Sequence, residues 1–123
     1  MDKHQEYQYL DLIKEILKVD SLDIGRNGKV KSIFGCMMKF DLTNNVLPVL
    51  TTKKVAIKTC LKELLWFISG KTDNKILKNN NVHIWTANGS REFLDSRNLN
   101  YKEDDLGPVY GHQWRFFNAP YKD

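Results

Sequence analysis

The stretch from residue 51 to residue 68 is the feature that most constrains the fold of this chain. Its apolar residues recur every three or four positions, at Ile57, Cys60, Leu61, Leu64, Leu65 and Ile68. This spacing is typical of one face of an amphipathic helix. Residues 64–68 are all apolar, and a helix that is apolar all round is expected to be buried all round. We therefore expect this helix to be the centre of the fold.

Glu63 is the acidic residue of this stretch. On a helical wheel it lies on the side of Trp66 and Phe67, away from Lys58 and Lys62. A carboxylate beside aromatic rings is poorly solvated, which raises its pKa toward the range useful for proton transfer. The alternative is that Glu63 reaches solvent from the helix edge, since Glu is rarely buried. The spacing leaves both interpretations open.

The first part of the chain predicts one helix and one strand. Apolar residues at helical spacing indicate a helix over residues 5–19, followed by a loop with an Asn27-Gly28 turn. Residues 30–42 alternate between apolar and other residues, which is typical of a strand. A turn at residues 43–45 then leads toward the central helix. We expect Cys36, in the strand, and Cys60, in the helix, to be reduced and buried.

The part after the central helix predicts short helices separated by turns. Ser69-Gly70 ends the central helix, and Thr72 or Asp73 is a candidate cap for a helix reaching Lys78. Ser90 is a candidate cap for a helix over residues 91–97. Residues 98–105 are polar and predict an exposed loop. With no internal repeat and no Pro/Ser-rich linker, residues 1–123 indicate one domain or a piece of one.

Composition excludes several classes of protein. Apolar residues make up 41% and charged residues 28%, which is ordinary for a globular chain, and the net charge is +4. This charge does not require nucleic acid and fits a small anionic ligand equally well. We find no apolar run that could span a membrane and no secretory signal, so we expect a cytoplasmic chain. His4, His83 and His112 lack metal-ligand spacing, so we expect no metal.

Four segments carry a resemblance to a known family. They are Leu-Pro-Val-Leu-Thr-Thr-Lys-Lys-Val (47–55), Lys-Glu-Leu-Leu-Trp-Phe-Ile-Ser-Gly (62–70), the run from His83 to Arg97, and the run from Asp105 to Arg115. In this order they resemble the thymidylate synthase family. The resemblance implies an α+β fold in which helices pack on one face of a twisted sheet. It covers only the first part of the family's length, so residues 1–123 are expected to be the N-terminal portion of a single domain, with the fold truncated.

The resemblance also implies site residues. Glu63 and Tyr110 match catalytic positions, and Ile84, Trp85 and Asn88 match positions that hold the folate. Lys53 matches the lysine that faces the folate's glutamate tail. Arg26 matches the arginine that binds the nucleotide phosphate, although the match needs a one-residue deletion, without which Gly25 takes its place. We expect Trp114 to be a core residue, and His112 and Arg115 to lie at the surface or behind the site.

The reaction implied by the resemblance is reductive methylation of dUMP to dTMP, with methylenetetrahydrofolate as co-substrate. The family's nucleophilic cysteine lies in a Pro-Cys-His segment, and the 123 residues contain no such segment. We therefore expect the chain to be inactive alone and to act as a homodimer or with a partner chain that carries the C-terminal part. The alternatives are a non-catalytic remnant that binds nucleotide or folate or forms dimers, and part of a dCMP hydroxymethylase.

Overall fold

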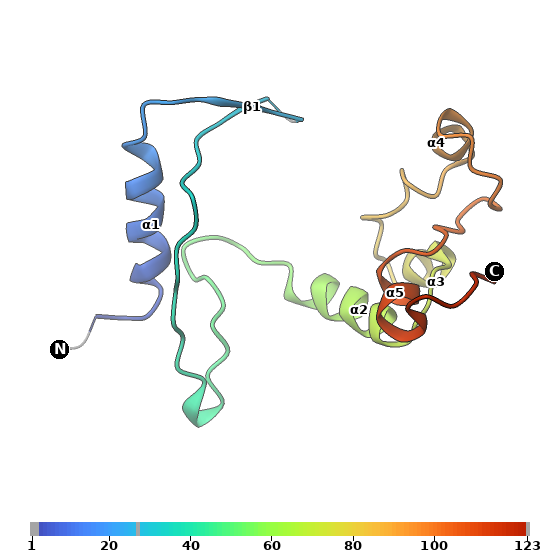
Figure 1. Cartoon of the computed structure of the whole chain (residues 1–123). Coiled ribbons are helices and arrows are strands. Elements are labelled where there is room, and N and C mark those ends of the chain that lie inside the picture. Colours follow the sequence, from blue (N-terminus) through green and yellow to red (C-terminus); the bar gives the residue numbers. More distant parts are fainter. Residues whose placement is uncertain (1–2, 27, 123) are drawn as a thin grey trace. The chain divides into compact units, whose positions relative to one another are not determined.

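The computed structural model describes residues 3–26 and 28–122 of the chain (Figure 1). The backbone divides into two compact units, residues 1–55 and residues 56–123. The described residues form five α-helices and one two-stranded antiparallel sheet. The secondary structure is therefore compatible with the predicted α+β class, and more of it is helix than strand. None of the helices among the described residues has the length and apolar character that a membrane span requires.

The first unit begins with helix α1 (Tyr7–Leu17), which is two residues shorter at each end than predicted. A hairpin follows, formed by β1 (Asp23–Gly25) and β2 (Gly28–Val30). Gly28 of the predicted turn has a φ of +114°, a value that favours glycine. Asn27 lies outside the described residues. The turn predicted at residues 43–45 is present as a short 3-10 helix, η1 (Thr43–Asn45).

The strand predicted over residues 30–42 was wrong: β2 ends at Val30, and the described residues 31–42 contain no strand. Their backbone pairs instead with two side-chain amides of the α1 region. The Lys39 amide donates to Gln8 Oε1 over 2.8 Å, and Gln8 Nε2 donates to the Lys39 carbonyl over 2.6 Å. Gln5 bonds the amide and the carbonyl of Asp41 in the same way. These amides occupy backbone groups that a neighbouring strand would otherwise use.

The second unit is built on helix α2 (Ile57–Ile68), which contacts α3 (Asn74–Asn79) and α5 (Tyr110–Phe116). Its buried apolar core consists of Trp66, Leu77 and Val82, against which four further apolar side chains pack: Phe67, Trp85, Leu106 and Val109. The predicted α2 stripe is thus confirmed as a helix. The core forms where α2 meets α3 and the segments that follow it.

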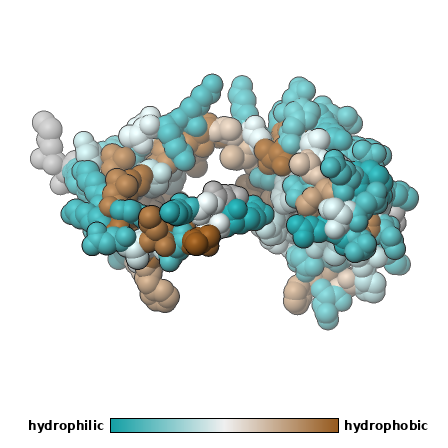
Figure 2. Space-filling model, turned by 90° about the horizontal axis from the view of Figure 1, so that it is seen from above, coloured by the Kyte–Doolittle hydropathy of each residue, from teal (hydrophilic) through white to brown (hydrophobic). Residues whose placement is uncertain are grey.

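The expectation that residues 64–68 are buried all round was wrong. Trp66 is buried, but Leu64, Leu65 and Ile68 are 42%, 53% and 43% exposed. Within the second unit α3 and α5 contact α2, and these two short helices leave part of its circumference uncovered. Figure 2 shows apolar side chains (brown) at the surface of the chain among hydrophilic ones.

Helix α2 ends at a glycine that the sequence identified. The Gly70 amide donates to the Phe67 carbonyl over 2.9 Å, and the Lys71 amide donates to the Trp66 carbonyl over 3.3 Å. These two bonds define a Schellman ending, and the φ of Gly70 is +68°. A Cβ at Gly111 of α5 would lie 2.3 Å from the Lys71 carbonyl oxygen. Glycine at this position therefore lets α5 approach the end of α2.

Two predicted helix caps are confirmed. The Asp73 side chain accepts from the Lys75 amide at the start of α3. The Ser90 side chain accepts from the Phe93 amide at the start of α4 (Arg91–Ser96), which is one residue shorter than predicted. Both caps satisfy amides that the first helical turn leaves without a partner. The local sequence was sufficient to place both helix starts.

Further burial predictions were wrong, among them the exposed loop over residues 98–105, in which Asp104 and Asp105 are buried. Cys36 and Cys60 are both exposed and unpaired. Cys36 lies in the extended segment that was predicted to be a strand, and Cys60 lies on an exposed part of α2. Trp114 is 56% exposed rather than a core residue. In contrast His112, which we expected at the surface or behind the site, is buried, and its Nε2 lies 3.2 Å from the Ala119 carbonyl oxygen.

Candidate active site

Glu63 lies on α2, and its carboxylate has a partner in the turn of residues 84–89. Trp85 Nε1 donates a hydrogen bond to Glu63 Oε1 over 2.7 Å. Glu63 and Trp85 are both half-buried. An indole has one donor, so this bond fixes the orientation of Trp85 relative to α2. Two residues that the sequence singled out 22 positions apart are therefore in direct contact.

Phe67, one turn after Glu63 on α2, organises the aromatic side chains around this contact. Its ring centroid lies 6.3 Å from that of Trp85, 5.4 Å from that of Tyr110 and 5.4 Å from that of Trp114. All three ring pairs are steeply inclined, at 80°, 75° and 61°. Edge-to-face pairs of this kind are favourable because a positive ring edge meets a negative ring face. Tyr110 is also 6.1 Å from Trp85, so it joins the same cluster.

The turn that carries Trp85 and Asn88 is held by Asp104. The Asp104 amide donates to the Gly89 carbonyl over 2.8 Å, and its carboxylate accepts from Asn74 Nδ2 and Lys78 Nζ, each over 2.8 Å. Asp104 is buried. Burial alone favours its neutral acid, but the bonds from Lys78 and Asn74 outweigh this effect and lower the pKa of Asp104. Asp104 thus joins α3 to the end of the 84–89 turn.

The remaining candidates of the second unit are accessible. Ile84 is 53% exposed and Tyr110 is 55% exposed, while Asn88 is half-buried. Ile84 and Asn88 lie in the same turn as Trp85. Exposed apolar side chains beside a half-buried indole offer a surface on which a flat heteroaromatic ring can stack. The structure therefore brings together Glu63, Trp85 and Tyr110 and places Ile84 and Asn88 in the turn that carries Trp85.

Arg26 and Lys53 belong to the first unit, and both are exposed. Arg26 follows β1 at the turn of the hairpin. Lys53 follows Thr51 and Thr52, whose amides and hydroxyls all donate to the carboxylate of Glu6. Sequence reasoning did not single out Glu6, Asp104 or the central position of Phe67. No local signal marks a Glu at a helix start that binds a segment 45 residues away.

The described residues contain no group of three or more His, Cys, Asp or Glu side chains suited to hold a metal ion. The chemistry of the cluster in the second unit is that of a carboxylate, a phenol and an indole. Such groups can accept, donate and relay protons, and they can present an aromatic surface to a ligand. The cluster therefore combines hydrogen-bonding groups with an accessible aromatic surface.

Comparison with known proteins identifies the family of this chain. Residues 7–123 match the family model of thymidylate synthase, so the chain is related to transferases that make dTMP. The chain belongs to the thymidylate synthase family.

Individual relatives are bifunctional dihydrofolate reductase-thymidylate synthases. The chain is 54% identical to the one from Daucus carota over 99% of its own length and 23% of the relative's. It is 52% identical to the one from Leishmania major, over 97% of the chain and 23% of the relative. It is 48% identical to the one from Zea mays, over 99% of the chain and 24% of the relative. The chain thus spans about a quarter of the length of these relatives.

Proposed function

We propose that this chain carries the N-terminal part of a site for reductive methylation of dUMP to dTMP. The observation that supports the proposal most strongly is the hydrogen bond from Trp85 Nε1 to Glu63 Oε1, 2.7 Å long, within an aromatic cluster that includes Tyr110. It joins a residue proposed for proton transfer to a residue proposed for folate binding. Methylenetetrahydrofolate supplies both the carbon and the hydride of this reaction.

Each residue has a proposed role that its surroundings allow. Glu63 moves protons and polarises the pyrimidine carbonyl through water, and the Trp85 bond holds one of its oxygens in place. Tyr110, with its ring packed on Phe67, orders water around the pyrimidine. The folate ring is held by Ile84, Trp85 and Asn88.

The exposed cations have complementary roles. The Arg26 guanidinium, on a hairpin turn, offers forked donors to the nucleotide phosphate. Lys53 attracts the carboxylates of the folate tail. Both side chains are exposed and therefore accessible to a charged ligand.

The proposal includes the surroundings in which the chain acts. The nucleophile is a cysteine thiolate supplied from outside these residues, because Cys36 and Cys60 lie in no Pro-Cys-His segment. We propose a homodimer, or association with a chain that supplies this segment, and a cytoplasmic location. The many exposed apolar side chains of residues 34–47, among them Phe34 and Met37, are consistent with association.

Glu63→Gln tests the proposal. The amide keeps the shape of Glu63 and can still accept the Trp85 bond, but it cannot exchange a proton. In the chain supplied with the cysteine-bearing part, kcat for dTMP formation should fall by about a hundredfold or more, while dUMP affinity is kept. The matched control is Glu92→Gln, which changes an exposed acid of the same unit and should leave kcat unchanged.

Two outcomes would contradict the proposal. If Glu63→Gln keeps kcat within a few-fold of the parent, Glu63 is a structural carboxylate. If the combined protein binds dUMP or folate but forms no dTMP, the non-catalytic alternative replaces the proposed activity. The 123-residue chain alone serves as the blank and should release no tritium from labelled dUMP.

A further inference from the structure

The backbone of Asp104 adopts a conformation that is uncommon for a residue with a side chain. Its φ is +71°, in the left-handed region that glycine favours. Asp tolerates this region better than most residues, but the conformation still costs free energy and persists only where the surroundings fix it. Asp104 is also 6% exposed, so both its backbone and its carboxylate need partners.

Helix α3 supplies partners for Asp104 on one side. The Asn74 amide donates to the Asp104 carbonyl over 2.8 Å, and Asn74 Nδ2 donates to Oδ1 of the Asp104 carboxylate over 2.8 Å. Lys78 lies one turn further along α3, and its Nζ donates to Oδ2 over 2.8 Å. Both oxygens of the carboxylate are therefore bonded to the same helix, which fixes the position of Asp104 relative to α3.

The turn of residues 84–89 supplies a partner on the other side. The Asp104 amide donates to the Gly89 carbonyl over 2.8 Å, and a Cβ at Gly89 would lie only 3.1 Å from Asp104 Cα. The two backbones are thus in close approach. The Gly89 amide in turn donates to the Trp85 carbonyl over 3.1 Å, and the Trp85 indole donates to Glu63. A continuous series of hydrogen bonds therefore connects α3 through Asp104 to Glu63.

The indole of Trp85 has a single donor, so its bond to Glu63 depends on where the turn holds the ring. We propose that Asp104 is a positioning residue, whose carboxylate fixes the 84–89 turn to α3 and thereby sets the contact between Trp85 and Glu63. A ring held in this way is already oriented for the folate before the ligand binds. The inference rests on the proposed function for the role of the folate, whereas the contact itself belongs to the 123-residue chain.

The first test uses the 123-residue chain without ligand and follows the NMR resonance of the Trp85 Nε1 proton, which is assigned by its loss in Trp85→Phe. Asp104→Gly removes the carboxylate and leaves a residue that favours the φ of +71°. The resonance should move toward its position in Glu63→Ala, in which the acceptor is absent. Lys78→Met removes one donor to Asp104 and should cause a smaller shift in the same direction.

The conservative variant is Asp104→Asn. Asn also tolerates a positive φ, and its amide oxygen can accept from Lys78 or from Asn74. The Trp85 resonance should therefore lie between its positions in the parent and in Asp104→Gly. A role of the backbone alone would leave the resonance of Asp104→Gly at the parent position, because glycine keeps the amide that bonds Gly89.

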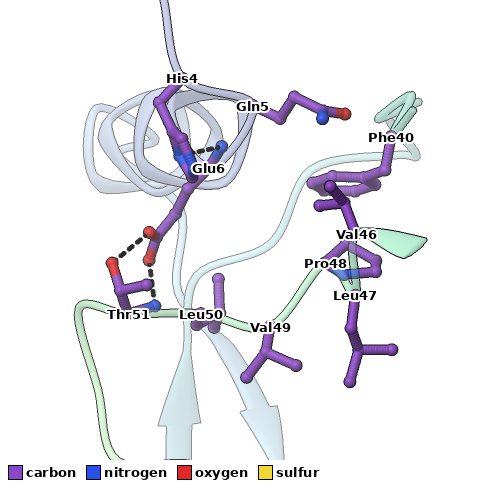
Figure 3. Close-up of a pocket in the computed structure, with 10 residues that line it drawn as sticks. All are labelled: His4, Gln5, Glu6, Phe40, Val46, Leu47, Pro48, Val49, Leu50 and Thr51. Carbon is purple, nitrogen blue, oxygen red and sulfur yellow. Dashed lines mark hydrogen bonds between the residues drawn. The ribbon is translucent and has the colours of Figure 1, made fainter. Parts of the chain in front are cut away.

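Two controls separate positioning from a general loss of stability. Asp95→Asn changes a carboxylate of the same unit that is 66% exposed and is paired with Arg91 of its own helix. Glu6→Ala changes the buried carboxylate of the first unit, which Figure 3 shows directed at Thr51 beside a small pocket. The second control should destabilise the chain, because it leaves the donors to Glu6 without their acceptor. Neither control should move the Trp85 resonance.

The second test measures KM for both substrates in the chain supplied with the cysteine-bearing part. Asp104→Gly should raise KM for methylenetetrahydrofolate by about two- to tenfold, the scale of one lost hydrogen bond. KM for dUMP should stay unchanged, because Glu63 keeps its carboxylate. A purely structural role would lower the amount of active protein, and hence the apparent kcat, without this difference between the two KM values.

The outcomes decide between these roles. If the Trp85 resonance of Asp104→Gly stays at the parent position, or moves equally in Asp95→Asn or Glu6→Ala, the inference is overturned. It is also overturned if the resonance moves but the two KM values change equally or not at all. If the parent forms no dTMP, the proposed function fails, whereas the resonance shift needs no substrate and still supports or overturns the positioning of Trp85 by Asp104.

Discussion

The two units of this chain are stabilised by different physical means. The second unit has a buried apolar cluster that consists of Trp66, Leu77 and Val82. Leu94 of α4 is a further buried apolar residue of this unit. In the described part of the first unit the buried residue is a carboxylate, Glu6, and polar side chains bond distant segments through backbone groups and through other side chains. Apolar burial is non-directional and tolerates small shifts, whereas a bonded carboxylate depends on geometry and on pH.

The largest difference in the free energy of unfolding is expected between Leu77→Ala in the second unit and a leucine substitution in the first. Leu77 is 1% exposed, so the substitution leaves a cavity and should lower the free energy of unfolding by about 2–5 kcal/mol. The same substitution in the first unit, Leu17→Ala, changes a residue of α1 that is 64% exposed and should cost no more than about 0.5 kcal/mol. Urea denaturation followed by circular dichroism measures both. Equal losses would show that the first unit also depends on apolar packing.

A smaller difference is expected between two Lys–Asp pairs. Lys78 bonds Asp104, whose side chain is 8% exposed, so Lys78→Met removes a donor from a buried carboxylate. The expected cost is about 1–3 kcal/mol. Lys14 pairs with Asp11 at 3.4 Å, and both side chains are well exposed, so Lys14→Met should have little measurable effect on the free energy of unfolding. If the two variants unfold at the same urea concentration, burial does not distinguish these pairs.

The smallest effect is local and depends on pH. The ordinary pKa of Glu6 is 4.5, and its bonds lower this pKa to about 2 in the folded chain. Because the pKa of Glu6 is lower in the folded chain, its bonds contribute their full stabilisation above pH 4.5. This contribution is lost as the pH falls from 4.5 to about 2. Hydrogen exchange of the Thr51 and Thr52 amides, corrected for intrinsic rates, should lose protection over this range. Protection of these amides should be weak at every pH in Glu6→Ala, which removes the oxygen that accepts from both amides. Protection that survives well below pH 2 would refute the assignment.

The elements that the sequence predicted correctly carry their signal locally. The α2 stripe, the Asp73 and Ser90 caps and the Gly70 ending each involve residues within a few positions of one another. The strand predicted over residues 30–42 failed because alternation states only that one face is apolar. Whether a strand forms depends on a partner, and here the amides of Gln5 and Gln8, more than 30 positions away, bond the backbone instead.

The candidate site was predictable to a similar degree. The sequence singled out Glu63, Trp85 and Tyr110 separately, and the contact between Glu63 and Trp85 could be known only from the structure. Cys36 and Cys60 were expected to be buried because free cysteine usually is, yet both are exposed. Glu6 could not be found from its own surroundings, since its partners Thr51 and Thr52 lie 45 and 46 positions away.

The Trp85–Glu63 bond also has a spectroscopic consequence. Indole emission responds to charge and to hydrogen bonding at the ring nitrogen, so Trp85 is an intrinsic optical probe of the carboxylate beside it. The other two tryptophans make different contacts, because Trp66 donates to the Asp73 carbonyl and Trp114 is largely exposed. A ligand that displaces or reorients the Glu63 carboxylate should therefore change the emission of Trp85. The site can thus be followed without an added label.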